Sequence, residues 1–298
     1  MSAAQVYGRP SPAARALASV AAWCPPPLGQ RGGPPLFAPD GAPGIVTRMR
    51  TTIRLGLFAG AAMLALAFVA SQHLGSAQAY EQPANDAQPE TMEQFLTTVT
   101  KDVDTYWTSV FEGAGLPEPR VSYAWIPAGQ AAASACDNGE TMGDSAAAYC
   151  AADDTIYISQ QFATDIYDGA LDQALPGSSQ GYGRTVGDFA VAYIVAHEYG
   201  HQIQDELGLF ERYGNQLPTS AFELQADCYA GTWANSAYRD NRLEDGDVQE
   251  AIDAALAVGD FDASSPMHHG TPEQRAEAWN AGFESGDPAT CDSFLTAA

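Results

Sequence analysis

The stretch "VAYIVAHEYGHQIQ", residues 191–204, determines how the rest of the chain is interpreted. Apolar residues recur around it at helical spacing, and we expect one long helix from about Val186 to Leu207. Residues four apart on a helix lie on one face, so His197 and His201 can reach the same ion, with Glu198 beside them. This is the H-E-x-x-H arrangement of a metal site. An ordinary buried helix is the alternative, but a buried glutamate there is costly unless it is paired or liganded.

A third metal ligand must come from elsewhere in the chain. Metzincins continue with a glycine and a third histidine, where this chain has Gln204 and Leu207. The segment from Ala221 to about Tyr238 reads as a helix, with Glu223 and Asp227 four apart on one face. Glu223 can complete a catalytic zinc site, and Asp227 can accept the N–H of a ligand histidine.

Two alternatives for these carboxylates stay open from the residues alone. Ser220 and Glu223 also fit a capping box, in which the glutamate bonds back to the serine amide. In that case Asp227 would be the third ligand.

The stretch "MHHGTPEQR", residues 267–275, contains two further histidines. His268 or His269 can stabilise the oxyanion of a tetrahedral intermediate. Adjacent residues usually point apart, so we expect at most one of them to face the site. A surface turn is the alternative interpretation.

The remaining segments predict an α+β fold, mostly helical with a small β-sheet. Alternating residues indicate strands at 120–127 and 154–159, with a loop rich in Gly, Asn, Asp and Ser at 136–150. The second strand could be an edge strand that pairs with an extended substrate. Helical patterns cover 91–113, 247–258 and 272–283, the second with Asp245 or Asp247 as its cap and the third with Thr271 as N-cap before Pro272.

The N-terminal part predicts export rather than a folded core. Residues 1–48 are rich in Pro, Gly, Ala and Arg. We interpret them as a disordered extension, or as residues that precede the true translation start at Met49. Residues 49–79 have the layout of a signal peptide or membrane anchor, with 53–73 as the anchoring segment. Residues 80–90 read as a linker. Residues 91–298 are long enough to form one domain with a sizeable core, and they contain the H-E-x-x-H motif. We therefore expect an extracytoplasmic protein, secreted or anchored to the membrane.

Charge and cysteines agree with export. The first 79 residues hold six of the 13 lysines and arginines but one of the 37 acidic residues, so residues 80–298 carry 7 basic and 36 acidic residues. So acidic a surface should repel nucleic acid and anionic membranes, and an anchor would be the one membrane contact. Four cysteines remain after the leader, and no CxxC spacing suggests a cysteine zinc site. We predict two disulfides, Cys136–Cys150 and Cys228–Cys291.

Several blocks in order resemble the neutral zinc metallopeptidases of bacteria. They are "DVDTYW" (102–107), "YCAADDTIYIS" (149–159), "GDFAVAYIVAHEYGHQIQ" (187–204), "ELQADCYAGTWA" (223–234), "LEDGDVQEAIDAALAVGD" (243–260) and "HGTPEQRAEAWNAGFESGDPATCDSF" (269–294). The sequence departs from the family pattern at Gln202, where members often carry another His. It also departs at Phe261, which interrupts a common Gly-Asp-Asp run. Neither residue is a proposed ligand.

The resemblance implies a zincin-like domain that binds Zn²⁺. It implies His197, His201 and Glu223 as ligands, Glu198 as the catalytic glutamate, and Asp227 as the partner of a ligand histidine, because "ELQAD" is similar to the E-x-x-x-D of gluzincins. It also implies His269 rather than His268 as the histidine of the last block.

The expected function is a zinc-dependent endopeptidase acting on a peptide or protein substrate through a metal-activated water. A zinc-stabilised binding or scaffold protein without turnover and a cell-wall amide hydrolase are the alternatives.

Overall fold

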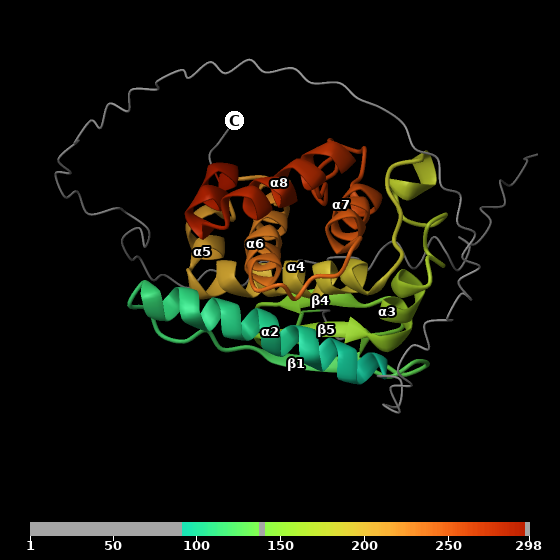
Figure 1. Cartoon of the computed structure of the whole chain (residues 1–298), viewed down its shortest axis with the longest axis horizontal. Helices are drawn as coiled ribbons and strands as arrows, with labels where there is room; N and C mark the ends of the chain where they lie inside the picture. Colours follow the sequence, from blue (N-terminus) through green and yellow to red (C-terminus); the bar gives the residue numbers. More distant parts are fainter. Residues whose placement is uncertain (1–90, 137–140, 296–298) are drawn as a thin grey trace, which may run out of the picture. The chain divides into compact units, whose positions relative to one another are not determined.

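The computed structural model describes residues 91–136 and 141–295, and they form the predicted mostly helical α+β domain (Figure 1). The predicted extension, signal or anchor, and linker lie outside these residues. Within them, no helix is long and apolar enough to cross a membrane. In chain order the elements are α2 (Met92–Gly113), β1 (Ser122–Ile126), β2 (Ala132–Ala133), β3 (Thr141–Met142), β4 (Ala147–Cys150), β5 (Thr155–Ser159), α3 (Gln160–Tyr167), η1 (Ser178–Gln180), α4 (Asp188–Glu206), α5 (Leu209–Tyr213), α6 (Thr219–Arg239), α7 (Asp247–Val258), α8 (Pro272–Ser285) and η2 (Pro288–Leu295).

The main sheet has three strands in the order β1-β5-β4. β5 pairs in parallel with β1 and antiparallel with β4, so it is the central strand. The expectation that residues 154–159 form an edge strand is therefore wrong. The edge strands are β1 and β4, and β4 lies inside the segment that the sequence predicted as a loop. This strand has only four residues, two of which are alanine, so it lacks an alternating pattern strong enough to predict a strand.

The two faces of the sheet meet different partners. Ile156 and Ile158 of β5 join the main core, whereas Tyr157 between them joins a small cluster on the other face. This follows from the alternation of side chains along a strand. The small cluster includes the disulfide Cys136–Cys150, which the sequence predicted.

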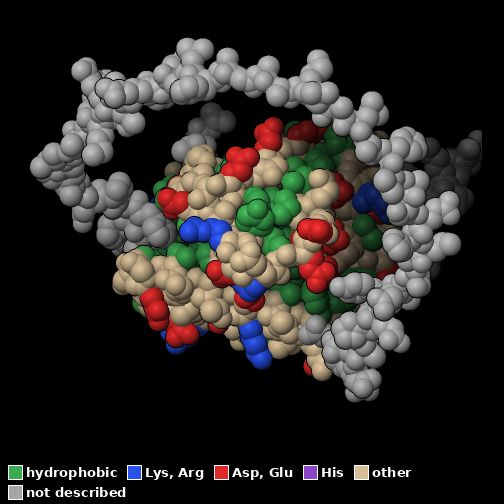
Figure 2. Space-filling model, in the orientation of Figure 1, with side chains coloured by type: hydrophobic (Ala, Val, Ile, Leu, Met, Phe, Trp, Pro, Cys, Tyr) green, Lys and Arg blue, Asp and Glu red, His purple; other side chains and the backbone are tan. Residues whose placement is uncertain are grey.

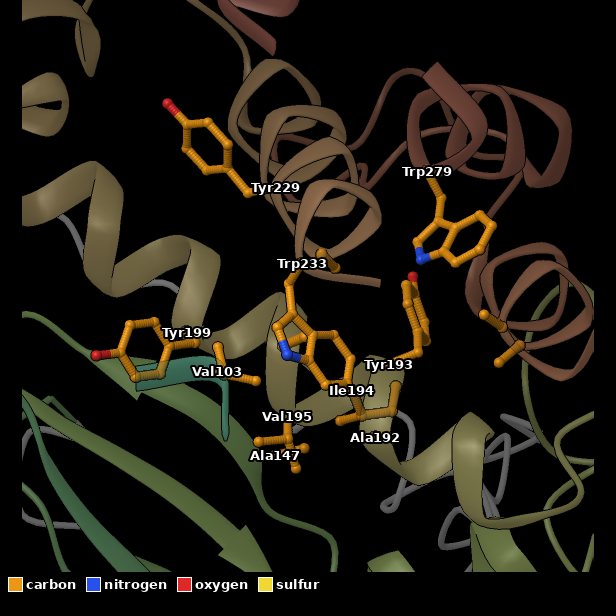
Figure 3. Packing of buried hydrophobic residues seen from close by; sticks show 14 of the residues in the cluster. Val103, Ala147, Ala192, Tyr193, Ile194, Val195, Tyr199, Tyr229, Trp233 and Trp279 are labelled. Atoms are coloured by element: carbon orange, nitrogen blue, oxygen red, sulfur yellow. The ribbon is translucent and has the colours of Figure 1, made fainter. Parts of the chain in front are cut away.

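Helix α4 runs between the sheet and the helices α6, α7 and α8 (Figure 1). It is buried on all sides from Phe189 to Gln204. Val195 points from α4 toward Ala147 of β4, whereas Tyr193 points to the side of α6 and α8, where Trp279 lies (Figure 3). A helix this buried must satisfy every polar side chain inside the protein, which the histidines and glutamate of α4 do as described below.

Helix ends agree with the sequence in one case and not in another. Thr271 caps α8 with a complete capping box to Gln274, and Pro272 occupies the first turn, as predicted. For α7 the N-cap is Gly246, with no side-chain cap. Asp247 instead accepts the backbone N–H of Glu244, so the predicted capping by Asp245 or Asp247 is wrong.

A second disulfide, Cys228–Cys291, joins α6 to η2, again as predicted. Helices α6 and α8 also approach each other at backbone distance. A Cβ on Gly231 would lie 2.1 Å from the carbonyl oxygen of Trp279, and a Cβ on Gly282 would lie 1.9 Å from that of Cys228. Only glycine fits at these two positions, so α6 and α8 form one tightly packed pair.

Candidate metal centre

Helices α4 and α6 cross where Gly200 meets Ala226. A Cβ on Gly200 would lie 3.0 Å from the Cα and the carbonyl oxygen of Ala226, so the two backbones nearly touch. The two motif histidines flank Gly200 on α4, and Glu223 and Asp227 flank Ala226 on α6. Side chains four apart share one helix face, so the crossing brings the two pairs together.

Glu223 has the environment of a metal ligand. Its side chain is fully buried, and neither carboxylate oxygen has a hydrogen-bond partner. Oε2 lies 3.3 Å from Nε2 of His197, and Oε1 lies 3.4 Å from Nε2 of His201. The two Nε2 atoms are 3.2 Å apart. Two imidazole nitrogens and one carboxylate converging in this way are a donor set suited to zinc, with a fourth position for water or substrate.

The alternative roles of the two carboxylates do not fit the structure. Helix α6 begins at Thr219 after Pro218 and has no side-chain cap, so the capping box between Ser220 and Glu223 is absent. Asp227 does not join the convergent group. Its Oδ1 lies 2.9 Å from Nδ1 of His197, the ring nitrogen that faces away from Glu223.

Each histidine of α4 has its own acceptor for Nδ1. Asp227 serves His197, and Oε1 of Gln204 lies 2.9 Å from Nδ1 of His201. Gln204 in turn donates to the carbonyl of Phe222 at 2.7 Å. Because an acceptor at Nδ1 holds the proton there, both rings present Nε2 to the common point. Gln204, which in the sequence only excluded the metzincin pattern, thus orients the ring of His201.

The charges of the centre shift the pKa values of its groups. Burial lowers the pKa of His197, but the carboxylate of Asp227 outweighs it and raises that pKa to about 9. Burial raises the pKa of Glu223, but the neighbouring His201 and His197 hold it well below its usual range. Asp227 behaves in the same way, with Arg275 as the main cause of its lowered pKa. Both carboxylates are therefore ionised in the interior, as a cation site requires.

Glu198 is held separately from the ligand group. Its Oε2 accepts the backbone N–H of Tyr149, on the edge strand β4, at 2.8 Å. The hydroxyl of Tyr149 lies 2.8 Å from Asp205 and 3.0 Å from Asp154. The strand thus fixes the direction of the Glu198 carboxylate, and the tyrosine side chain fixes the strand.

The loop before α8 holds its two histidines on one carboxylate. Nδ1 of His268 lies 2.5 Å from Oδ1 of Asp260, and Nδ1 of His269 lies 3.2 Å from Oδ2. The backbone N–H of His269 also donates to Oδ2 at 2.8 Å. The charge of His269 contributes to the lowered pKa of Glu223, which places this histidine within electrostatic reach of the centre. The expectation that adjacent histidines point apart is wrong here, because Asp260 draws both rings together.

Four residues for which the sequence predicted no role form hydrogen bonds to the residues of this site. They are Tyr149, Tyr193, Asp260 and Arg275. Each acts on a residue that belongs to another element or to a distant part of a loop. Helical or strand periodicity does not report such contacts. The one local signal was that Arg275 and His269 belong to the same block, "HGTPEQR".

A second group of carboxylates, Asp188, Asp247 and Glu250, lies near the start of α4. Glu250 accepts the backbone N–H of Phe189, and a side chain on Gly187 would collide with it. Glu250 therefore caps α4 from α7, which is a structural role. Acidic side chains are spread over the face shown in Figure 2, as the composition predicts.

Comparisons with known proteins agree with this geometry. Residues 26–294 match the family described as "Putative neutral zinc metallopeptidase". "Uncharacterized protein YpfJ" of Escherichia coli is 39% identical over 166 residues, which is 49% of this chain and 53% of the relative. "Uncharacterized protein Rv2575" of Mycobacterium tuberculosis is 32% identical over 219 residues, or 65% of this chain and 68% of the relative.

The match thus spans about half the length of the E. coli relative and about two thirds of the mycobacterial one. No solved structure matches the chain. The family match contains every residue of the convergent group as well as Glu198 and the loop histidines. The chain belongs to the neutral zinc metallopeptidase family.

Proposed function

We propose that the protein is a zinc-dependent endopeptidase, with zinc held by His197, His201 and Glu223. The observation that carries this proposal is the buried carboxylate of Glu223. Both of its oxygens lack a hydrogen-bond partner and face the Nε2 atoms of two histidines. A buried anion left in this state is costly, and a bound cation removes the cost.

Held by these three residues, zinc would lower the pKa of a bound water to about 7 and would supply a Lewis acid for the scissile carbonyl. Glu198 accepts the proton of the attacking water and passes it to the leaving amine nitrogen. The hydrogen bond from the Tyr149 amide supports this role, because it holds one carboxylate oxygen of Glu198 in place. A structural zinc site has no use for a carboxylate positioned in this way.

His269 stabilises the negative charge that develops on the carbonyl oxygen. Asp260 holds its ring through Nδ1 and its backbone through the N–H. A ring that is fixed before the reaction loses no reorganisation energy when the charge appears. His269 is also one of the groups that lower the pKa of Glu223, which supports a position near the proposed metal site.

The substrate is a peptide in extended conformation that pairs with β4. In the antiparallel β4–β5 ladder, Tyr149 is opposite Ile156 and Ala147 is opposite Ile158. The N–H of Tyr149 points away from β5, to Glu198, so by the alternation of the ladder the N–H and C=O of Ala147 point the same way. The N–H of Tyr149 is used by Glu198, so the outward main-chain groups of Ala147 are the ones suited to bind a peptide by strand addition.

We further propose that the protein works outside the cytoplasm, secreted or anchored through residues 53–73. The two disulfides support an oxidising compartment. The excess of acidic residues argues against nucleic acid as a partner.

The test is cleavage of an unfolded protein by the purified chain, with and without a chelator. Glu198→Gln should retain one zinc per chain in elemental analysis and lose cleavage by at least about a thousandfold, since it keeps the shape but cannot accept the proton. The matched control is Glu112→Gln, at an exposed position on α2, which should cleave like the unaltered protein. Cleavage at the unaltered rate in Glu198→Gln would contradict the assignment.

The same assay separates the alternatives. A scaffold protein would bind zinc and cleave nothing, and a wall amide hydrolase would act on cell-wall amides but leave unfolded protein intact. The ligand assignment has its own pair of variants. Glu223→Ala should lower the zinc content, whereas Ser220→Ala, three residues away, should not.

A further inference from the structure

Arg275 is a buried arginine at the start of α8, between α4 and α6. Only 4% of its surface is exposed. Its Nε donates to Oδ2 of Asp227 at 2.7 Å, and Nη2 donates to Oδ1 at 2.8 Å. Nη2 also lies 3.2 Å from the hydroxyl of Tyr193. Such a two-pronged contact fixes the plane of the carboxylate as well as its position.

The carboxylate of Asp227 accepts hydrogen bonds from side chains of two other helices, α4 and α8. Its Oδ1 accepts from the hydroxyl of Tyr193 at 2.7 Å and from Arg275, and it lies 2.9 Å from Nδ1 of His197. A buried carboxylate can stay ionised only when such partners outweigh the loss of water. Arg275 is the partner that brings a full positive charge.

Arg275 also brings a fixed positive charge close to both carboxylates of α6. Besides its two contacts with Asp227, its Nη1 lies 3.8 Å from Oε2 of Glu223. Without the arginine these two buried carboxylates would lose that partner, which is strongly unfavourable.

We propose that Arg275 is a positioning residue for the metal centre, acting through Asp227 on His197. This inference rests on the proposed zinc site. By gripping both oxygens of Asp227, Arg275 keeps Oδ1 aimed at Nδ1 of His197. That hydrogen bond in turn directs Nε2 of His197 to the metal.

The packing of α8 explains how the guanidinium reaches this place. Thr271 and Pro272 start the helix, and Gly270, with φ of +103°, turns the loop into it. A Cβ on Gly270 would lie 3.4 Å from Cγ of Arg275, so the loop closes directly over the arginine side chain. Further along α8, the close contact with α6 holds the helix in register with Asp227.

The experiment measures the zinc dissociation constant of the full chain by competition with a chromogenic chelator. Arg275→Gln should weaken zinc binding by about 10- to 100-fold, the range for partners of ligand histidines. Arg275→Lys keeps the positive charge but cannot make both hydrogen bonds to Asp227, so it should recover part of that lost zinc affinity. Arg242→Gln is the matched control, since that arginine pairs with Asp102 at a half-exposed position and should leave zinc binding unchanged.

A double-variant cycle tests the route through Asp227. Asp227→Asn alone should weaken zinc binding, and Arg275→Gln should cost less in that background than in the unaltered chain, because the two shortest contacts of the arginine are with Asp227 and only longer approaches, such as 3.8 Å to Oε2 of Glu223, remain. This double variant also removes both buried charges, so it remains measurable if Arg275→Gln alone does not fold. The visible spectrum of the cobalt-substituted protein should change in Arg275→Gln, since it reports the geometry of the ligands.

Unaltered zinc affinity in Arg275→Gln, or full additivity in the double variant, would overturn the inference while leaving the proposed function intact. Failure of the unaltered protein to bind zinc would instead overturn the proposed function.

Discussion

The histidines of α4 and the histidines of the loop before α8 are held in different ways. His197 and His201 each have a separate acceptor at Nδ1, and their Nε2 atoms lie 3.2 Å apart. His268 and His269 share the single carboxylate of Asp260. The side chains of the first pair are 4% exposed, whereas those of the second pair are 12% and 19% exposed.

Under the proposed function, this difference corresponds to two roles, metal binding by the α4 pair and contact with the substrate by the loop pair. Two rings with separate supports on a rigid helix can converge on one point, which a metal requires. The rings of His268 and His269 both turn toward Asp260, and neither belongs to the group formed by His197, His201 and Glu223. Both loop histidines keep some contact with solvent, and His269 is one of the groups that lower the pKa of Glu223. It is therefore suited to meet a substrate that enters from outside.

The largest expected effects on zinc content and cleavage come from replacing one histidine of each pair by glutamine. His201→Gln removes a ligand from the convergent group and should abolish stoichiometric zinc together with cleavage. His269→Gln should retain one zinc per chain and lower kcat by about 10²- to 10³-fold, as for the loss of one oxyanion donor. Elemental analysis and steady-state kinetics on both variants measure this. Loss of zinc in His269→Gln would remove the distinction between the two pairs.

The sequence predicted the α4 pair better than the loop pair. Helical periodicity places His197, His201 and Glu223 on facing sides of two helices, and the structure brings them together. The same reasoning could not find Asp260, because no regular spacing links it to His269. It could not find Arg275 either, whose partner Asp227 is 48 residues away.

The edge strand β4 was missed for a related reason. Its residues, Ala147–Cys150, are four in number and lie in a segment whose composition favours a loop. What makes them a strand is their pairing with β5 and the burial of both faces, which are tertiary effects. Functional details in this protein thus depend on contacts between elements, whereas the elements that carry the ligands are encoded locally.

A second, smaller effect should appear in the pH dependence of the α4 pair. In the metal-free protein the pKa of His197 is raised from 6.5 to about 9, against the effect of burial, by Asp227. Zinc must displace this proton, so its affinity should rise about tenfold per pH unit between pH 7 and 9. The stability that the protonated histidine gives the metal-free protein is complete below pH 6.5 and is lost as the pH rises through 9.

Chelator competition at several pH values and denaturant unfolding of the metal-free protein measure the two trends. Asp227→Asn should flatten both, because it removes the carboxylate that raises the pKa. His269→Gln should leave the slope of zinc affinity as it is. An equal change of slope in both variants would mean that the loop pair shares the proton of the centre.

The smallest expected effect concerns the two glycines next to these histidines. Gly200→Ala adds a Cβ 3.0 Å from the backbone of Ala226, so α4 and α6 must separate by a few tenths of an ångström. We expect zinc affinity to fall by about three- to tenfold, because the ligands lie on both helices. Gly270→Ala is the matched change in the loop. Its φ of +103° strains any other residue by about 1–2 kcal/mol, and the shifted loop should lower kcat more than it lowers zinc affinity, because its added Cβ meets only the side chains of Leu224 and Arg275. Equal losses of zinc affinity in the two variants, measured by zinc titration beside the kinetics, would contradict the separation of roles.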